Sequence, residues 1–393
     1  MIVRDITLAL KKAAKQFSAI AVVGPRQSGK TTLVQSVFEG HAYVSLEDLD
    51  LRAYAQSDPR DFLETRVSSQ GIILDEIQHV PELLSYIQTI IDREKKKGYF
   101  IITGSQNILL NQAITQTLAG RIAILTLLPL SINELSLHNA LPNSIEEFVF
   151  KGALPRIYDE NIDHEAVYKN YIRSYIERDV RDIKKIFDLS LFQKFVQLCA
   201  GRIGQLLNVS SLANDCGIDS KTAQSWLSVL EATYVIFLLH PYYKNFGKRL
   251  IKAPKLYFVD AGIACSLLRI RKIDELKEHY LRGSLVESLI ISDLYKQFYN
   301  LDQTPSLYFW RDHLGNEVDC IIEKALELVP IEIKAGKTIS SDYFKQFEYL
   351  TNIKDFPAEN NTLIYAGSEN QKRKDATVLA WKNSGTLVRD LIV

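Results

Sequence analysis

The chain has 393 residues, which is long for a single domain, so we expect two or three domains. Its 47 basic and 47 acidic residues give a formal net charge of zero, which argues against bulk electrostatic attraction to nucleic acid or to an anionic membrane. Any nucleic-acid surface must therefore be a local patch. The 47% hydrophobic and 24% charged residues are typical of globular rather than disordered proteins.

The cysteines and the N-terminal segment exclude several further classes. Residues 1–17 carry acidic and basic side chains within an apolar pattern, which indicates an amphipathic helix rather than a signal peptide. No run of 18 apolar residues occurs, so we expect no membrane-spanning helix, no membrane partner and a cytoplasmic location. Four widely spaced cysteines with apolar neighbours indicate small buried side chains rather than zinc or redox motifs: Cys199, Cys216, Cys265 and Cys320.

Short apolar runs alternate with helical stretches in the N-terminal third of the chain. The apolar runs are typical of buried strands, and the segments between them are typical of helices. This alternation predicts a parallel sheet covered by helices. We expect strands at residues 20–24, 42–46, 71–76, 99–104 and 122–130.

The stretch GPRQSGKT at residues 24–31 fits the phosphate-loop pattern G-x-x-x-x-G-K-[S/T] in full. It follows an apolar strand and precedes a helical stretch, so backbone N–H groups at the helix N-terminus would face the phosphates. Lys30 would reach the β- and γ-phosphates, and the Thr31 hydroxyl would bind Mg²⁺. The predicted nucleotide-binding residues are Gly24, Pro25, Arg26, Gln27, Ser28, Gly29, Lys30, Thr31 and Thr32.

Two carboxylates, Asp75 and Glu76, end the apolar run GIILDE. Burying adjacent acids at a strand end is costly unless cations are near, and Lys30 and Mg²⁺ would supply them. We expect Asp75 to hold Mg²⁺, directly or through water, and Glu76 to be the general base that polarises the attacking water. The alternative is that the two carboxylates only cap a helix.

Two further residues are candidates for the same site. The strand at 99–104 is followed by Ser105, Gln106 and Asn107, and this end of a parallel sheet lies beside the phosphate site. Ser105 is our first choice to orient the water; a plain turn is the alternative. Arg121 precedes the next strand and is a candidate arginine finger, for instance toward the γ-phosphate of a neighbouring subunit. The alternative is a surface arginine that pairs with a local acid.

At this point the sequence resembles a large prokaryotic family of AAA-type ATPases that carry a C-terminal domain of unknown function. The resemblance extends over nearly the whole chain and implies a P-loop ATPase core of the additional-strand type, a winged helix and a nuclease-like C-terminal region. It implies ATP as the cofactor but no pathway. The matching stretches are GPRQSGKTTL, IILDEIQHVPELL, IITGSQN, LAGR, LPLSINEL, FVFKGALPRIY, YIERDV and LIKAPKLYFVDAGIACSLL.

Residues 204–239 have the pattern of a helix-turn-helix. The first helix is expected to end at Gly217, and Asp219 or Ser220 would cap the second. The apolar positions expected to form the core of the second helix are Ala223, Trp226, Leu227 and Leu230. In DNA-binding proteins of this architecture the opposite face enters the major groove. The polar residues on that face are Lys221, Thr222, Gln224 and Ser225.

A basic stretch, YYKNFGKRLIKAPK, comes next and contains aromatic residues but no acid. A basic hairpin can bind phosphates, so double-stranded DNA is a candidate partner. A solvated β-wing, or a contact with the protein's own ATPase module, is the alternative. The cations of this stretch are Lys244, Lys248, Arg249, Lys252 and Lys255.

Acids and a lysine recur in a pattern near the C-terminus. Glu287 shares a helix face with apolar residues, and a carboxylate on such a face needs a partner. Asp319 lies in the second strand of a predicted hairpin, on the same face as Glu317. Glu332 and Lys334 are two positions apart in the strand PIEIK, so they point to the same side.

This order resembles the PD-(D/E)xK nuclease core. The resemblance implies that Asp319 and Glu332 bind one or two Mg²⁺ or Mn²⁺ ions, with Glu287 completing the site. Lys334 would stabilise the attacking hydroxide or the phosphorane charge. Nuclease folds also serve as binding or structural modules, so DNA cleavage is left open.

The predicted fold class is α/β, with a P-loop parallel sheet, a helical and winged-helix region, and a C-terminal restriction-endonuclease-like domain. We place the ATPase domain at 1–135, a helical linker or lid at 136–198, the winged helix at 199–275 and the nuclease-like domain at 276–393.

The expected function is ATP hydrolysis with Mg²⁺, in a homo-oligomer, coupled to a module that acts on DNA. One alternative is a nucleotide-dependent switch or assembly protein whose nuclease fold is an inactive docking scaffold, and a weaker one is a sequence-specific regulator.

Overall fold

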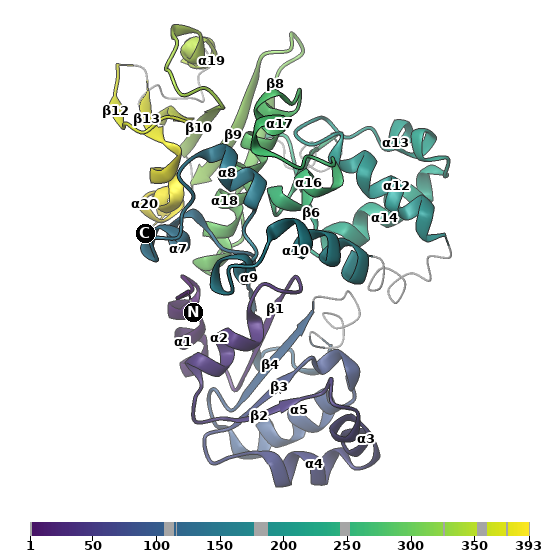
Figure 1. Cartoon of the computed structure of the whole chain (residues 1–393). Coiled ribbons are helices and arrows are strands. Elements are labelled where there is room, and N and C mark those ends of the chain that lie inside the picture. Colours follow the sequence, from purple (N-terminus) through teal and green to yellow (C-terminus); the bar gives the residue numbers. More distant parts are fainter. Residues whose placement is uncertain are drawn as a thin grey trace. The chain divides into compact units, whose positions relative to one another are not determined.

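The computed structural model of the chain, shown in Figure 1, divides into two compact units. Unit 1 comprises Met1–Pro129, Ala232–Tyr234 and Tyr299–Gln303. Unit 2 comprises Leu130–Glu231, Val235–Phe298 and Thr304–Val393. Among the residues that the structure describes, no helix is long and apolar enough to cross a membrane. The described residues are 2–105, 114, 116–176, 188–243, 252–324, 327–351, 360–374 and 376–392.

Unit 1 is built on a parallel sheet with the strand order β2-β3-β4-β1-β5, which confirms the parallel α/β sheet predicted from the sequence. The strands are β1 Ala19–Gly24, β2 Ala42–Ser45, β3 Ile72–Asp75, β4 Phe100–Ser105 and β5 Ile122–Thr126. The helices are α1 Thr7–Gln16, α2 Lys30–Val37, α3 Leu49–Ser57, α4 Pro59–Arg66 and α5 Leu83–Glu94, with a 3₁₀ turn η1 at Ile77–His79.

Both faces of this sheet are buried, because successive strand residues point to opposite sides. Ala21 of β1 belongs to a core cluster with Ile87 of α5. Its neighbour Ile20 belongs to a second cluster with Leu10 of α1 and Val34 of α2. Helices therefore cover the sheet on both sides, as the continuous apolar strand runs predict.

Strand β5 is shorter than the predicted run 122–130, since it ends at Thr126. The chain leaves the sheet where Leu127 passes the end of β1. A Cβ atom added to Gly24 would lie 2.1 Å from the carbonyl oxygen of Leu127, so only glycine fits at this contact. Pro129 then has no N–H group to extend the strand ladder.

Unit 2 begins with short helices, in agreement with the helical linker or lid predicted from residue 136 to residue 198; residues 177–187 lie outside the described part. The N-terminal helices are α7 Ile132–Leu137, α8 Ile145–Lys151, α9 Pro155–Asp159 and α10 His164–Tyr171, followed by a π-helical turn η2 at Ile172–Ile176. The next three are α12 Leu189–Ala200, α13 Val209–Cys216 and α14 Ser220–Ala232.

The turn between α13 and α14 forms as the sequence predicts. Gly217 ends α13 in the left-handed conformation, with φ of 85°. The Asp219 carboxylate caps α14 by accepting hydrogen bonds of 2.9 Å from the backbone N–H groups of Lys221 and Thr222. The predicted core residues Ala223, Trp226, Leu227 and Leu230 are all buried. Two antiparallel strands follow, β6 Ile236–Leu239 and β7 Lys255–Phe258.

The C-terminal part of unit 2 contains a mixed sheet with the order β12-β13-β11-β10-β9-β8. Strands β8, β9 and β10 are antiparallel, whereas β10, β11 and β13 are parallel. The strands are β8 Leu307–Arg311, β9 Glu317–Lys324, β10 Glu327–Lys334, β11 Thr362–Tyr365, β12 Gln371–Lys372 and β13 Thr377–Ala380. The helical elements are α16 Ala261–Leu267, α17 Ile273–Glu278, α18 Arg282–Asn300, η3 Ser341–Phe344, α19 Lys345–Thr351, η5 Trp381–Thr386 and α20 Leu387–Ile392.

A buried aspartate after strand β7, Asp260, connects this strand to the helices at the start of unit 2. Asp260 accepts hydrogen bonds from the Tyr168 hydroxyl at 2.8 Å, from the Ala153 N–H at 3.0 Å and from the Gly262 N–H at 2.8 Å. Three donors compensate the cost of burying the carboxylate. The four cysteines are buried, as predicted, and are free thiols.

Candidate nucleotide site and an acidic cluster

The phosphate loop runs from the end of β1 to the start of α2. Its backbone takes positive φ values at Gly24, Gln27 and Gly29, and the helix begins at Lys30. The Lys30 ammonium is buried in the loop, where it donates to the carbonyl oxygens of Gly24 at 3.1 Å and Pro25 at 2.9 Å. The cation therefore lies inside the loop that the sequence predicts to hold phosphate.

The Asp75 carboxylate, 5% exposed at the end of β3, is held by hydroxyl groups from other segments. Thr31 donates to Oδ1 at 2.9 Å, Tyr43 donates to Oδ2 at 3.0 Å, and Thr103 also donates to Oδ1. Burial, followed by the charge of Asp75, raises the pKa of Tyr43 to about 12, so its hydroxyl remains a donor. Thr31 and Asp75 thus bring together two oxygen atoms of the kind that Mg²⁺ prefers as ligands.

Sequence reasoning missed Tyr43 and Thr103. Thr103 is a buried polar residue that follows the apolar start of β4, and β4 pairs with β3 through Leu74 and Ile102, so Thr103 lies beside Asp75. This strand pairing joins residues that are 28 positions apart, such as Asp75 and Thr103, so it is not visible from local patterns. A lone threonine in a buried strand is the signal that could have been followed.

Glu76 leaves the strand in a left-handed conformation, with φ of 58° and ψ of 50°. Such values are unusual for a residue with a side chain and occur often at functional sites. The Glu76 N–H donates to the Thr103 hydroxyl at 3.3 Å, and its carboxylate accepts a hydrogen bond from Gln78. Thr103 therefore contacts both predicted carboxylate residues at once.

The pairing of the strands places the two remaining candidate residues, Ser105 and Arg121, at opposite ends of the sheet. Gly24 pairs with Ser105, so the end of β4 lies beside the start of the loop, as predicted; the water-orienting role of Ser105 stays a prediction. Gln106 and Asn107 lie outside the described residues.

Arg121 lies at the opposite end of the sheet from the phosphate loop. Its neighbour Ile122 pairs with Ala19, at the start of β1, whereas the loop follows the end of that strand. Arg121 also makes two hydrogen bonds to Asp92, from Nε at 2.6 Å and Nη2 at 3.0 Å. Six strand residues at about 3.3 Å each place it roughly 20 Å from its own loop. Contact with a nucleotide in the same chain is therefore excluded, and a role toward a neighbouring subunit stays a prediction.

Arg4 is a loop contact that sequence reasoning missed. Its side chain is 7% exposed and donates to the carbonyl oxygen of Ser28 at 2.6 Å and to that of Leu128 at 2.6 Å. One guanidinium group thus joins the phosphate loop to the segment after β5. Turning the Ser28 carbonyl toward Arg4 leaves the loop N–H groups to face a phosphate.

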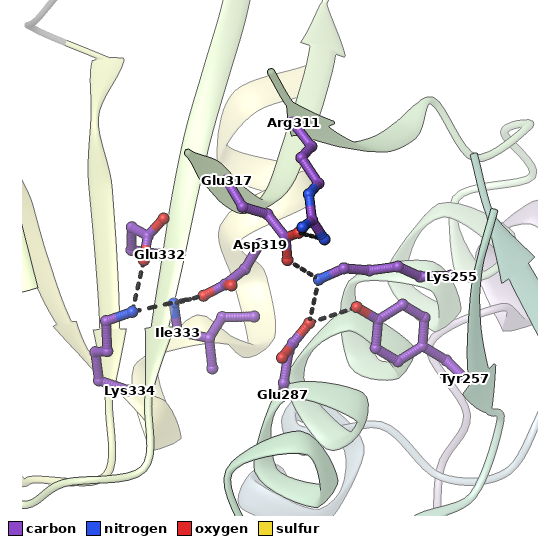
Figure 2. A network of polar contacts seen from close by, with 9 residues as sticks. All are labelled: Lys255, Tyr257, Glu287, Arg311, Glu317, Asp319, Glu332, Ile333 and Lys334. Carbon is purple, nitrogen blue, oxygen red and sulfur yellow. Dashed lines mark hydrogen bonds and ion pairs between the residues drawn. The ribbon is translucent and has the colours of Figure 1, made fainter. Parts of the chain in front are cut away.

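Unit 2 holds the second set of predicted site residues, which Figure 2 shows together with their contacts. On one side of the cluster, the Lys255 ammonium lies 3.1 Å from Oε1 of Glu287 and 2.5 Å from Oε1 of Glu317. The Tyr257 hydroxyl also donates to Glu287, and Arg311 lies 3.3 Å from Oε2 of Glu317.

On the other side, the side chains come from β9 and β10. Oδ2 of Asp319 accepts from the Ile333 N–H at 2.8 Å and lies 3.9 Å from the Lys334 ammonium (Figure 2). That ammonium donates to Oε2 of Glu332 at 2.6 Å. Burial and the charge of Asp319 raise the pKa of Glu332 to about 8, although Lys334 opposes the shift. The same two causes raise the pKa of Glu287 to about 7.

The structure thus brings the four predicted residues of this site into one neighbourhood. They are Glu287, Asp319, Glu332 and Lys334. Within the described ranges, however, no three His, Cys, Asp or Glu side chains are arranged to hold a metal ion. The predicted second Mg²⁺ or Mn²⁺ site is not supported.

Lys255 was predicted to belong to an exposed basic hairpin, and this prediction is wrong. Its side chain is only 3% exposed, because β7 directs it toward α18 and β9. Of the predicted DNA contacts, Lys221, Gln224 and Lys252 are exposed. The Thr222 hydroxyl donates to the Asp219 carboxylate at 2.6 Å and so belongs to the helix cap. Lys244, Lys248 and Arg249 lie outside the described residues.

The position of Arg4 gives a first test. We expect Arg4→Ala to raise the Kd for Mg²⁺-ATP about tenfold, because losing one charged hydrogen bond of about 1.5 kcal/mol corresponds to that factor. Arg4→Lys should recover part of the affinity. Titration with a fluorescent ATP analogue measures the effect, and Lys11→Ala on the exposed face of α1 is the control. Equal affinity of Arg4→Ala and Lys11→Ala would contradict a loop-positioning role.

Comparison with known families agrees with this geometry. Residues 16–136 match the model of the AAA domain. Two further models, each described as a domain of unknown function (DUF8612 and DUF4143), match residues 142–274 and 282–383.

Uncharacterized proteins of Mycobacterium tuberculosis and Mycobacterium bovis are each 27% identical to this chain over 338 residues, which is 86% of this chain and 75% of the relative. An uncharacterized protein of Methanocaldococcus jannaschii is 26% identical over 231 residues, 56% of this chain and 45% of that protein.

Among solved structures, a Walker-type ATPase of Pyrococcus abyssi has 16% identity and a TM-score of 0.47, covering 69% of this chain and 96% of that one. AMPPCP-bound DnaA of Aquifex aeolicus has 14% identity and a TM-score of 0.30, covering 57% of this chain and 85% of that one. The matched model, the parallel sheet and the complete phosphate loop agree: residues 16–136 form a P-loop domain that is similar to the AAA domain family.

Proposed function

We propose that this protein hydrolyses ATP with Mg²⁺ in unit 1. The observation that carries the proposal is the direct hydrogen bond between Thr31, which follows the phosphate-loop lysine, and the buried Asp75. These two oxygen ligands would hold Mg²⁺, which supplies charge neutralisation on the phosphate oxygens. ATP is then the substrate that the loop is built to bind.

The residues of the chain have separable roles in this reaction. The Lys30 ammonium binds β- and γ-phosphate oxygens, and loop N–H groups at the start of α2 bind the remaining phosphate charge. The Glu76 carboxylate takes a proton from the attacking water as general base. Thr103 fixes the Asp75 carboxylate and the Glu76 backbone relative to one another. Ser105 at the end of β4 is proposed to orient the water.

Substitution of the loop lysine and of the base separates binding from hydrolysis. Lys30→Ala should abolish ATP binding, whereas Glu76→Gln should keep it and lower kcat by about 10²- to 10⁴-fold, since only the proton acceptor is lost. Phosphate release and ATP-analogue binding measure the two effects. The matched control is Glu82→Gln, an exposed glutamate nearby. Normal turnover by Glu76→Gln would show that another group is the base.

We further propose that the enzyme acts as a homo-oligomer in which Arg121 contacts the nucleotide of a neighbouring subunit. Arg121→Ala should then keep ATP binding and lose at least about 10³-fold in kcat, as arginine fingers do. Mixing it with Glu76→Gln should restore part of the activity, because an intact base meets an intact Arg121 across the interface. Asp92→Ala, which only removes the local partner, should stay active. Absence of any recovery on mixing would argue against this role.

The helix-turn-helix in unit 2 favours DNA as the partner that ATP hydrolysis controls, because Lys221 and Gln224 are exposed on the second helix. The alternative is a nucleotide-dependent switch in which unit 2 docks a protein.

If DNA is bound, Lys221→Ala combined with Lys252→Ala should lower the slope of log K against log salt by about 1.8, at about 0.9 per phosphate contact. A gel-shift titration measures this, with Lys272→Ala combined with Lys324→Ala as the charge-matched control. Failure of the wild-type protein to retard duplex DNA at physiological salt would favour the docking alternative.

A further inference from the structure

The acidic cluster of unit 2 already contains a cation, the ammonium group of Lys255. Lys255 reaches it from β7, and its ammonium lies between Glu287 of α18 and Glu317 of β9 (Figure 2). The Lys255 backbone is fixed on two sides, since it pairs with Leu239 of β6 and forms a bridge with Leu206. The position of Lys255 in the cluster is therefore fixed by the strand pairing of its backbone.

One oxygen atom of each of the three carboxylates predicted to bind metal is already engaged. Oε1 of Glu287 receives hydrogen bonds from Lys255 and Tyr257. Oδ2 of Asp319 receives the Ile333 N–H, and Oε2 of Glu332 receives the Lys334 ammonium. Oε1 of Glu332 is buried and receives no hydrogen bond among the described residues. Mg²⁺ takes six oxygen ligands in near-octahedral geometry, so a metal here would have to compete with these protein donors for the carboxylates.

The charges of the cluster are close to balanced. Its carboxylates are those of Glu287, Glu317, Asp319 and Glu332, and its cations are Lys255, Arg311 and Lys334. Burial opposes the charge of Lys255, but Glu287, Glu317 and Asp319 outweigh it and raise the pKa of the ammonium, so it stays protonated. A further divalent cation would have to enter beside this fixed positive charge.

We propose that Lys255 takes the place of a divalent metal in this cluster, so that unit 2 binds no metal there and does not use one to cleave phosphodiesters. The four carboxylates and their lysine then serve as an internal ion-pair network. Lys255 lies in the segment matched at 142–274, and the carboxylates lie in the segment matched at 282–383, so the network also fastens these two regions of unit 2 to one another. The proposal does not depend on ATP hydrolysis in unit 1.

Metal binding by the full chain tests this directly. All proteins carry Asp75→Asn, so that the nucleotide site lacks its carboxylate metal ligand, and Mn²⁺ is titrated without nucleotide by electron paramagnetic resonance of the free ion. The protein with intact Lys255 should show no saturable Mn²⁺ binding. Lys255→Met keeps the aliphatic stem, removes the charge and should create one saturable site. Adding Asp319→Asn to Lys255→Met should abolish that new site.

Two comparisons keep the test decisive. Lys252→Met, three residues earlier and exposed, makes the same charge change and should create no site. In the protein with intact Lys255, Asp319→Asn and Glu332→Gln should leave the Mn²⁺ titration unchanged, and this comparison holds even if Lys255→Met fails to fold. Saturable Mn²⁺ binding that requires Asp319 while Lys255 is present would overturn the proposal. A folded Lys255→Met protein without a new site would overturn it as well.

Discussion

The cost of burying a charge without a partner shapes both sites of this molecule. In unit 1, the buried Asp75 carboxylate accepts hydrogen bonds from hydroxyl groups of one helix and two strands. The buried Arg4 guanidinium donates hydrogen bonds to two backbone carbonyl oxygens. In unit 2, the buried Lys255 ammonium lies between two glutamates. Each charge is compensated by groups that are distant in sequence, so the same contacts that satisfy it also fix the tertiary structure.

Much of this architecture could be predicted from the sequence, because it depends on local patterns. Apolar runs with intervening helices gave the parallel sheet, and the phosphate-loop spacing gave the site at the end of β1. Gly217 and Asp219 marked the turn between α13 and α14. In these cases the information lies within a few residues. The neighbourhood of Glu287, Asp319 and Glu332, by contrast, was implied by the resemblance of their order to the PD-(D/E)xK nuclease core.

The remaining features depend on which strands become neighbours, and this is not a local property. Arg4 contacts residues 24 and 124 positions away, and Thr103 reaches Asp75 only because β4 pairs with β3. Lys255 was assigned to an exposed basic stretch because its neighbours in sequence are basic, whereas its actual neighbours in space are acids. Arg121 was a candidate for the phosphate site, yet the register of β5 places it at the other end of the sheet.

The make-up of unit 1 has a practical consequence for anyone who wishes to produce it alone. Unit 1 takes in two short segments from later in the chain, at Ala232–Tyr234 and Tyr299–Gln303. Within the unit, the Tyr234 hydroxyl lies 3.2 Å from the Thr126 hydroxyl, and the ring of Tyr234 meets that of Tyr299 edge to face. A fragment cut after residue 129 would lose both tyrosines and expose the end of β5. Recombinant expression, limited proteolysis and domain exchange should therefore treat unit 1 as discontinuous, with boundaries that no single cleavage point can reproduce.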